Sequence, residues 1–426
     1  MESLTPINVS TLREALIDEL KVKGHLVSPT VEAAFRAVPR HLFVPGASLE
    51  EAYADRSIPT KRLNDQVVSS SSQPAIMAIM LEQLGLEPGY KVLEIGAGTG
   101  YNAALMAHLV GKTGQVISVD IDQDIVDIAR EHLVVAGFDR VQVVCADGGH
   151  GYAEAAPYDR IILTVGASDI APAWWEQLKP GGRLVLPLGI RDGQKSIAFE
   201  RRADHLLSLS VKDCGFMPLR GVFAAPPVSQ LSLGPDPGLF LEVEATRPID
   251  TEAVYRWLIG PSQDWPTDVA VSVCERLSGL RLWLALPESN VGILLAKGDM
   301  VDRGLVPPLV GLGGEWKSVS TSVLLGETGL VALMRPPGQP APLIDINEFH
   351  TASNSFTLFV RQFGRAEDLA QRLIEQVKAW DEAGRPASEN LLIRAYPKWA
   401  GYTRSVDDLV VEKQWTWLVL GWQRGP

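Results

Sequence analysis

Residues 91–101 read Lys-Val-Leu-Glu-Ile-Gly-Ala-Gly-Thr-Gly-Tyr. The apolar run before the glycines has the pattern of a buried strand, and a helical pattern follows from residue 102 to 110. A strand, a glycine turn and a helix in this order allow the backbone to come close to a nucleotide cofactor. A dinucleotide fingerprint reads G-x-G-x-x-G, whereas this turn reads G-x-G-x-G with Glu94 two residues earlier. For the glycines alone, the alternative is an ordinary tight strand-to-helix connection.

Two further acids stand at the ends of the next predicted strands. Asp120 closes the apolar strand 116–119, and Asp147 follows the strand 141–145. A carboxylate in the position of Asp120 can accept hydrogen bonds from both hydroxyls of a ribose. S-adenosylmethionine has no pyrophosphate to cradle, and its sulfonium and amino groups attract nearby acids. The acids therefore favour S-adenosylmethionine over a dinucleotide, and a helix cap is the alternative role for Asp147.

The composition excludes several classes of protein. The chain has 426 residues, 46% of them hydrophobic and 21% charged, which suggests two or three globular domains. Its net charge of −12 argues against nonspecific nucleic-acid binding. Three widely separated cysteines and scattered histidines predict no disulfide framework and no metal site. We expect no signal peptide, no membrane span and a cytoplasmic location.

The character of the sequence changes near residue 222. Up to residue 188 apolar strands alternate with helical patterns, which is typical of a doubly wound parallel sheet. An antiparallel pair near 195–201 and 206–211 would complete this sheet, and Pro- and Gly-rich segments follow at 225–227 and 234–238. We therefore expect a Rossmann-like α/β domain over 1–222, with N-terminal helices and a substrate loop in 1–85, where residues 51–74 are polar and loop-like. Residues 223–426 predict an α+β domain, in which short apolar runs, among them 280–285 and 291–296, have the pattern of strands.

Several segments of the first half together resemble the protein-L-isoaspartate O-methyltransferases. They are Val38-Pro39-Arg40 with Phe43-Val44-Pro45, Tyr53-Ala54-Asp55-Arg56 with Ile58-Pro59, Ser72-Gln73-Pro74, the glycine turn, Ala146-Asp147-Gly148, Ala156-Pro157-Tyr158-Asp159, the run from Leu178 to Gly189, and Phe216-Met217-Pro218-Leu219. The resemblance covers roughly residues 5–222. The extension beyond it is similar, in architecture only, to that of relatives associated with ribosomal peptide biosynthesis.

The resemblance implies a site for S-adenosylmethionine, with S-adenosylhomocysteine as the product. The expected cofactor-binding residues are Gln73, Pro74, Glu94, Gly96, Ala97, Gly98, Gly100, Asp120, Ile121, Asp147 and Gly148. Ser70 and Ser72 would place catalytic hydroxyls beside the methyl group. The expected substrate-binding residues are Ser70, Ser71, Ser72, Val165, Gly166, Leu186 and Pro187. By composition alone, the four serines 69–72 would instead be a flexible linker.

The chemistry of this family is methylation of a carboxylate, usually the α-carboxylate of an isoaspartyl residue. The following amide nitrogen then attacks the ester, and methanol leaves to give a succinimide. A carboxylic acid of pKa about 4 is already ionised at neutral pH, so no general base and no metal is needed. Positioning and removal of water from the carboxylate would carry the rate.

Two departures from the family pattern affect the substrate prediction. The family usually has Gln-Thr-Ile-Ser where this chain has four serines, and its repair enzymes usually end near the equivalent of residue 222. We therefore expect the tailoring of a ribosomally made peptide at an aspartyl or isoaspartyl residue, with general repair of aged protein as the alternative. A non-catalytic peptide-binding module is the alternative from another class. The tryptophans beyond residue 222 fit core packing or a peptide groove, and a chain truncated after Val222 is expected to keep its cofactor site.

Overall fold

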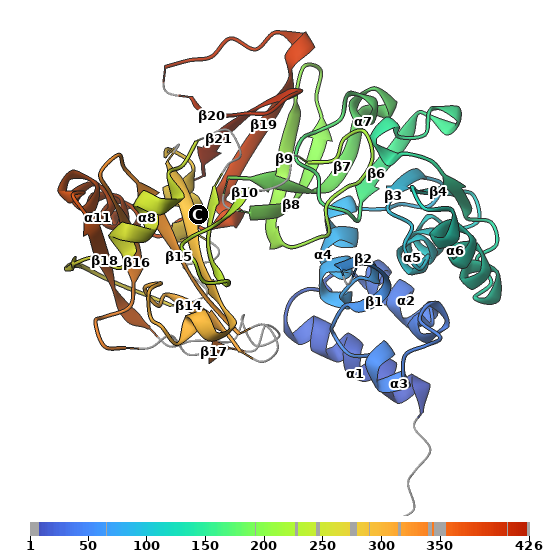
Figure 1. Cartoon of the computed structure of the whole chain (residues 1–426). Coiled ribbons are helices and arrows are strands. Elements are labelled where there is room, and N and C mark those ends of the chain that lie inside the picture. Colours follow the sequence, from blue (N-terminus) through green and yellow to red (C-terminus); the bar gives the residue numbers. More distant parts are fainter. Residues whose placement is uncertain are drawn as a thin grey trace, which may run out of the picture. The chain divides into compact units, whose positions relative to one another are not determined.

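The computed structural model describes residues 8–64, 66–191, 193–225, 229–243, 248–272, 279–288, 290–313, 317–339, 343–344, 355–406 and 408–423. The chain forms two compact units (Figure 1). Unit 1 comprises Met1–Ala225 and Leu392–Gly421, and unit 2 comprises Pro226–Leu391 and Trp422–Pro426. The first boundary falls close to the expected one. The assignment of residues 392–421 to the second domain is wrong, because their strands join the sheet of unit 1.

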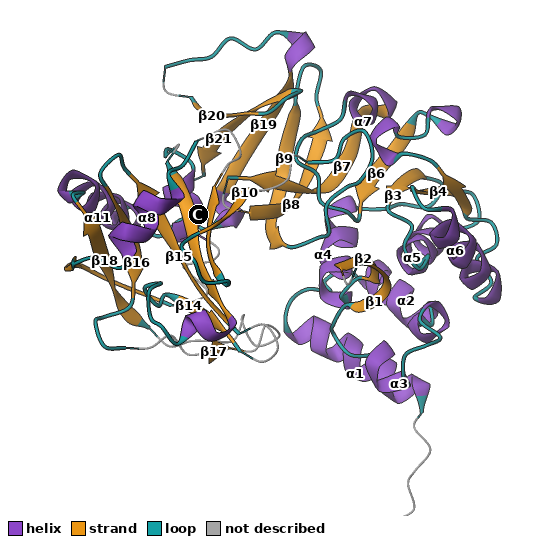
Figure 2. Ribbon diagram, viewed as in Figure 1, coloured by secondary structure: helices purple, strands orange, loops and turns teal. Residues whose placement is uncertain are grey.

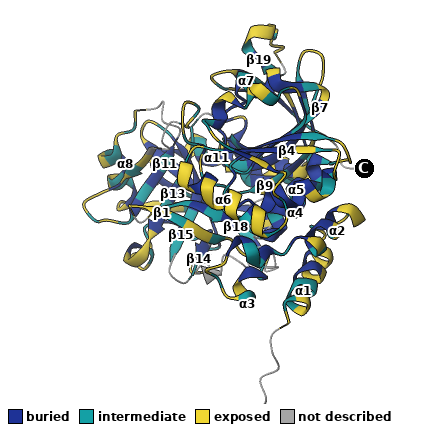
Figure 3. Ribbon diagram, turned by 90° about the vertical axis from the view of Figure 1, so that its right-hand side faces the viewer, coloured by how far each residue is buried: buried dark blue, intermediate teal, exposed yellow. Residues whose placement is uncertain are grey.

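Unit 1 begins with short helices and a hairpin. These elements are α1 (Val9–Val22), α2 (Pro29–Ala37), the 3₁₀ turn η1 (Arg40–Phe43), α3 (Leu49–Ala52), β1 (Ile58–Leu63) and β2 (Gln66–Ser71). Leu16, Ile17 and Leu20 bury one face of α1, whose other side is exposed (Figure 3). Residues 51–74 read as a polar loop in sequence, but β1 and β2 pair there as an antiparallel two-stranded sheet.

The doubly wound core of unit 1 follows. Its elements are α4 (Pro74–Leu84), β3 (Lys91–Ile95), α5 (Tyr101–Val110), β4 (Gln115–Asp120), α6 (Gln123–Val135), β5 (Gln142–Cys145), β6 (Tyr158–Leu163), α7 (Pro172–Gln177), β7 (Leu178–Ile190), β8 (Gly193–Arg201) and β9 (Leu206–Cys214). Strands β3 to β7 pair in parallel, and β8 and β9 are antiparallel to their neighbours. The predicted doubly wound α/β fold is confirmed.

Three strands from the end of the chain extend this sheet. They are β19 (Leu391–Pro397), β20 (Leu409–Glu412) and β21 (Thr416–Trp422), and the strand order is β20-β21-β19-β9-β8-β7-β6-β3-β4-β5. The direction in which successive strands are added changes at β3, whose neighbours are β4 and β6. The carboxyl ends of β3 and β4 therefore lie at a topological switch point, where open α/β sheets bind their ligands.

Unit 2 is built around a second sheet (Figure 2). Its elements are β10 (Ser229–Ser232), β11 (Leu239–Val243), α8 (Thr251–Leu258), β12 (Ser262–Val271), α10 (Arg281–Ala285), β13 (Val291–Lys297), β14 (Val310–Leu312), β15 (Ser318–Leu325), β16 (Gly329–Met334), β17 (Leu343–Ile344), β18 (Phe356–Gly364) and α11 (Glu367–Glu382). The main path of the sheet is β10-β11-β13-β15-β16-β18-β12. The α+β prediction is confirmed, although the expected strand 280–285 is the helix α10.

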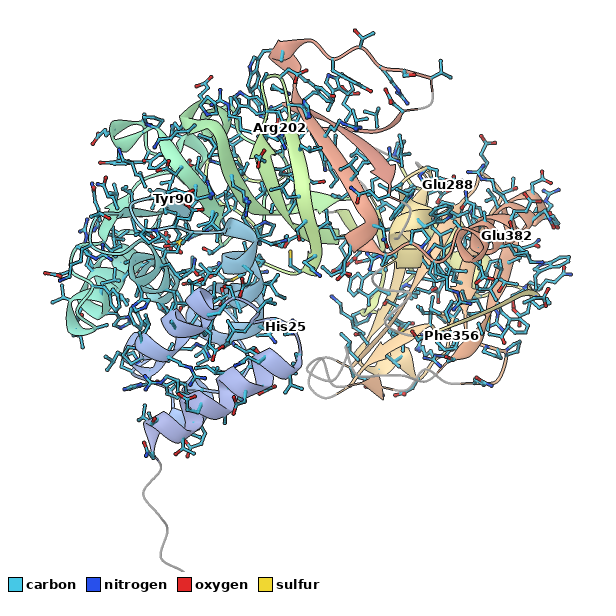
Figure 4. All side chains as sticks on the ribbon, turned by 180° about the vertical axis from the view of Figure 1, so that it is seen from behind. His25, Tyr90, Arg202, Glu288, Phe356 and Glu382 are labelled. Carbon is cyan, nitrogen blue, oxygen red and sulfur yellow. The ribbon has the colours of Figure 1, made fainter. Side chains whose placement is uncertain are left out.

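Both faces of the unit 2 sheet are buried at strand β16, which is apolar throughout. Val331 and Leu333 pack in one cluster with Val377 and Trp380 of α11. Leu330 and Ala332 point to the other face and pack in a cluster with α8. Glu288, labelled in Figure 4, accepts a 2.8 Å hydrogen bond from Arg372 Nε of α11. Cys274 lies outside the described residues.

Candidate functional site

The glycine turn connects β3 to α5 in a backbone conformation that requires glycine. The φ angles of Gly96, Gly98 and Gly100 are +102°, +52° and +85°, a region that L side chains rarely adopt. A Cβ atom on Gly96 would also come within 2.5 Å of the Thr164 hydroxyl. The motif is therefore a constraint on the backbone, because side chains larger than hydrogen would be strained at all three positions.

Asp120 meets this turn at the end of β4. Its Oδ2 accepts a hydrogen bond of 3.2 Å from the Gly98 backbone N–H, and its Oδ1 accepts one of 3.3 Å from Asp122. Burial raises the pKa of this carboxyl group. The next residue, Ile121, is 37% exposed and offers an apolar surface beside the acid. The arrangement places a carboxylate and an open apolar side chain next to the glycine turn.

Glu94 occupies a different environment from the other acids. It is fully buried, and it accepts hydrogen bonds from the Ser118 hydroxyl at 2.5 Å and from Asn102 Nδ2 at 2.8 Å. Burial raises its pKa to about 7. Its contacts join β3, β4 and the start of α5, so it fixes the elements on which the turn stands. A direct contact of Glu94 with a cofactor stays a prediction.

Asp147 is held from two directions after β5. Its Oδ1 accepts from the Gly149 N–H at 2.9 Å, so the helix-cap interpretation describes this oxygen. Its Oδ2 accepts from the Val222 N–H at 2.8 Å. The adjacent Gly148 carbonyl accepts from the Trp174 indole at 2.8 Å. The carboxylate is thus fixed in one orientation.

The serine loop, which we define as residues 69–72, lies over the glycine turn. The Ser70 carbonyl is 3.5 Å from the position of a Cβ on Gly98, so β2 passes over the turn. The Ser69 hydroxyl pairs with Thr60 across the hairpin at 3.1 Å, whereas the Ser71 hydroxyl is buried and has no hydrogen-bond partner. The linker interpretation of the serines is therefore wrong, since residues 69–71 belong to a paired strand.

A buried arginine and an aspartate fix the end of this loop. Arg40 is fully buried, and its Nη2 donates to the Ser72 carbonyl at 2.9 Å and to the Arg56 carbonyl at 3.2 Å. Asp55 accepts from Gln73 Nε2 at 3.1 Å and from the Ala75 N–H, where α4 begins with Pro74. The sequence motifs contained Arg40 and Asp55, but no role could be given to them, because their partners lie far away in the chain and are largely backbone groups.

Asp122 links two segments that border the site. Arg220 binds it in a bidentate ion pair at 2.8 and 3.2 Å, and Lys61 of β1 binds it at 2.8 Å. These bonds, led by the one from Arg220, lower the pKa of Asp122. Sequence reasoning missed this triad, since its members are far apart in the chain.

The expected substrate-binding residues after β6 and in β7 largely make contacts within unit 1. The Gly166 N–H donates to the Met217 carbonyl at 2.7 Å, and its carbonyl accepts from Leu219 at 2.8 Å. Leu186 and Pro187 are buried in β7, opposite Ile197 and Ser196 of β8. Half-buried Val165 alone keeps part of its surface open. The backbone of Gly166 is thus already paired with residues 217 and 219, and substrate binding by Gly166, Leu186 and Pro187 stays a prediction.

Comparisons with known proteins identify the family. The family model described as protein-L-isoaspartate(D-aspartate) O-methyltransferase matches residues 11–222. The protein-L-isoaspartate O-methyltransferase of Methanopyrus kandleri is 43% identical over 211 residues, which are 49% of this chain and 91% of that protein. The protein-L-isoaspartate O-methyltransferase 2 of Archaeoglobus fulgidus is 41% identical over 50% of this chain and 94% of that protein.

Solved structures include one titled protein-L-isoaspartate O-methyltransferase. It is 25% identical, with a TM-score of 0.48, and the match covers 90% of this chain and 96% of that one. Among the described residues, no helix is long and apolar enough to cross a membrane. The sequence identity to the curated relatives, over nearly their whole length, decides the assignment. The chain belongs to the protein-L-isoaspartate(D-aspartate) O-methyltransferase family and is a methyltransferase.

Proposed function

We propose that this enzyme uses S-adenosylmethionine to methylate an aspartyl or isoaspartyl carboxylate in a peptide, and that it tailors a ribosomally made peptide. The observation that carries the reaction is the convergence of the glycine turn, Asp120 and the serine loop at the carboxyl end of β3. Glycines in this conformation let the backbone come close to a ligand, and the acid beside Gly98 suits a ribose. The residues therefore fit this cofactor.

Each part of the site has a separate task in this proposal. Asp120 would hold the ribose hydroxyls, and Asp147 would face the adenine amino group. S-adenosylmethionine, when bound, supplies an electrophilic methyl group on its sulfonium. The hydroxyls of Ser70 and Ser72 would orient the peptide carboxylate, which is ionised at neutral pH without a general base. Arg40 and Asp55 fix the backbone around Ser72, so that the orienting groups need little rearrangement.

The ester then reacts within the peptide. The backbone amide nitrogen of the following residue attacks the ester carbonyl, and methoxide leaves with the amide proton as methanol. The product is a succinimide, whose hydrolysis gives aspartyl or isoaspartyl peptide. This step needs no group of the enzyme.

Two features support tailoring as the biological role. Residues 223–426 lie beyond the match to the family, and unit 2 is a separate compact unit that would recognise the peptide. The serine loop also carries a buried, unpaired hydroxyl at Ser71 where the family usually has an apolar residue. Repair of aged protein is the second candidate, and the 43% identity to a protein-L-isoaspartate O-methyltransferase supports it.

Gene neighbours and a rate comparison test this assignment. If a precursor peptide is encoded next to this gene, the enzyme should methylate an aspartyl residue of that modified peptide. It should do so faster than it methylates a linear isoaspartyl peptide. Efficient methylation of generic isoaspartyl peptides, equal in an enzyme that lacks unit 2, would instead establish repair.

A further inference from the structure

The last strands of the chain are anchored on a single buried carboxylate of the catalytic unit. Asp169 follows β6 and is 8% exposed. Its Oδ2 accepts from the Trp415 backbone N–H at 2.6 Å, and its Oδ1 accepts from the Thr416 hydroxyl at 2.5 Å. Strand β19 also pairs with β9, where the Ile393 N–H donates to the Ser208 hydroxyl at 2.8 Å. The start of β21 is therefore fixed to the segment of unit 1 that connects β6 to α7.

An aromatic contact continues from this anchor toward Asp147. The ring of Trp415 lies 6.1 Å from that of Phe223, and Phe223 lies 6.3 Å from Trp174, measured between centroids. Both distances are in the range of favourable aromatic pairs. Phe223 is thus held between a residue of α7 and a residue that precedes β21.

Phe223 in turn contacts the backbone that holds Asp147. A Cβ atom on Gly149 would come within 2.5 Å of the Phe223 ring, so the ring packs directly on Gly149. The two N–H groups that bind the Asp147 carboxylate belong to Gly149 and to Val222, the residue before Phe223. Any displacement of Phe223 would therefore move both donors.

We propose that Trp415 and Asp169 are positioning residues for the cofactor site, and that they act through Phe223 on the orientation of Asp147. Trp415 lies in the extension beyond the family match, so part of the extension serves cofactor binding. The inference rests on the proposed role of Asp147 at the adenine. The family-matched residues alone would lack this support.

Titration of the full-length protein with S-adenosylhomocysteine in a calorimeter tests the proposal. Trp415→Ala should weaken binding by about tenfold, which corresponds to the loss of an aromatic pair worth about 1.4 kcal/mol. Trp415→Phe should restore most of the affinity. Trp399→Ala is the matched control, because Trp399 is 52% exposed in the same C-terminal segment. This variant should bind S-adenosylhomocysteine with the affinity of the wild-type protein.

A double-mutant cycle separates positioning from general loss of stability. If Trp415 acts through Asp147, the effects of Trp415→Ala and Asp147→Asn on affinity should be clearly less than additive. Thr416→Val removes one bond to Asp169 with little change in volume, and it should weaken binding measurably even if Trp415→Ala fails to fold. Additive effects, or unchanged affinity in folded Trp415→Ala and Thr416→Val, would overturn the proposal. Failure of the wild-type protein to bind S-adenosylhomocysteine would contradict the proposed function instead.

Discussion

The chain beyond residue 225 contains two regions that differ in what they pack against. Residues 226–391 build unit 2, which has its own sheet and buries both faces of β16 under α8 and α11. Residues 392–421 return to unit 1, extend its sheet next to β9 and contact Asp169 and Phe223. The difference teaches that residues 226–391 are an insertion into the catalytic unit, which residues 392–421 then complete, rather than a domain added to its end.

Removing residues of these two regions should have the largest effects on the stability of unit 1 and on cofactor binding. Truncation after Val222 exposes the edge of β9 and deprives Asp169 of two hydrogen-bond donors. It should therefore lower the free energy of unfolding of unit 1 by several kcal/mol and favour aggregation. This differs from the expectation from sequence, in which the truncated chain keeps its cofactor site. Replacement of residues 227–388 by a flexible Gly/Ser linker should instead leave a folded protein that binds S-adenosylhomocysteine. Thermal unfolding and calorimetry of both proteins make the comparison.

The opposite result would reverse this interpretation. If the chain truncated after Val222 is as stable as the chain with the linker, the C-terminal strands are dispensable for unit 1. In that case the comparison between the two regions would fail.

Glu94 should give unit 1 a pH dependence of its own. Its pKa is raised by burial from 4.5 to about 7, so the folded state holds the proton more tightly than the unfolded state. Stability from this group is therefore fully present below pH about 4.5 and is lost as the pH rises to about 7. Glu94→Gln, which keeps a neutral amide, should become more stable relative to wild type by about 2–3 kcal/mol between pH 5 and 8. Urea unfolding at several pH values measures this difference, and a constant difference would contradict it.

Asp120→Ala tests the proposed cofactor site in the family-matched residues 11–222. In the proposed role of Asp120, the change removes two charge-assisted hydrogen bonds to the ribose, each worth roughly 1.5–3 kcal/mol when buried. Calorimetry with S-adenosylhomocysteine should therefore show a loss of affinity of at least tenfold. Asp124→Ala, an exposed acid at the start of α6, is the control and should bind normally. Affinity within twofold of wild type would mean that Asp120 does not hold the ribose.

Ser72→Ala should separate turnover from cofactor binding. If the hydroxyl orients the peptide carboxylate, kcat should fall by about 10²-fold while the affinity for S-adenosylhomocysteine stays within about twofold. Ser69→Ala is a matched control in the same loop, because the Ser69 hydroxyl pairs with Thr60 across the hairpin. Equal rates for wild type and Ser72→Ala would reduce Ser72 to a structural residue before Pro74.

The elements that sequence reasoning found are those whose signals are local. The glycine turn and the acids at the strand ends are short-range patterns, and the structure brings Asp120 into contact with Gly98. The hairpin β1–β2 was missed because its strands are polar and lack apolar alternation. Residues 280–285 show the reverse error, since a short apolar run fits a buried strand or a helix equally well.

The contacts between distant segments could not be predicted from local patterns. The bond from Ile393 to Ser208 spans 185 positions, and that from Trp415 to Asp169 spans 246. The hydrogen bonds that Arg40 makes with the described residues go to backbone carbonyls, which any residue type could provide. The sequence therefore identified the chemistry of the site but not the residues that hold it in place.

Transfer of a labelled methyl group from S-adenosylmethionine to a peptide tests the central claim most directly. The acceptors are an isoaspartyl peptide, its aspartyl counterpart and, where a neighbouring gene supplies one, the modified precursor peptide. We predict label in at least one of them as a base-labile ester that releases methanol, followed by a succinimide product with the mass of the peptide minus water. A protein that binds S-adenosylhomocysteine but transfers no base-labile methyl group to any of these acceptors would contradict the assignment of carboxyl methylation.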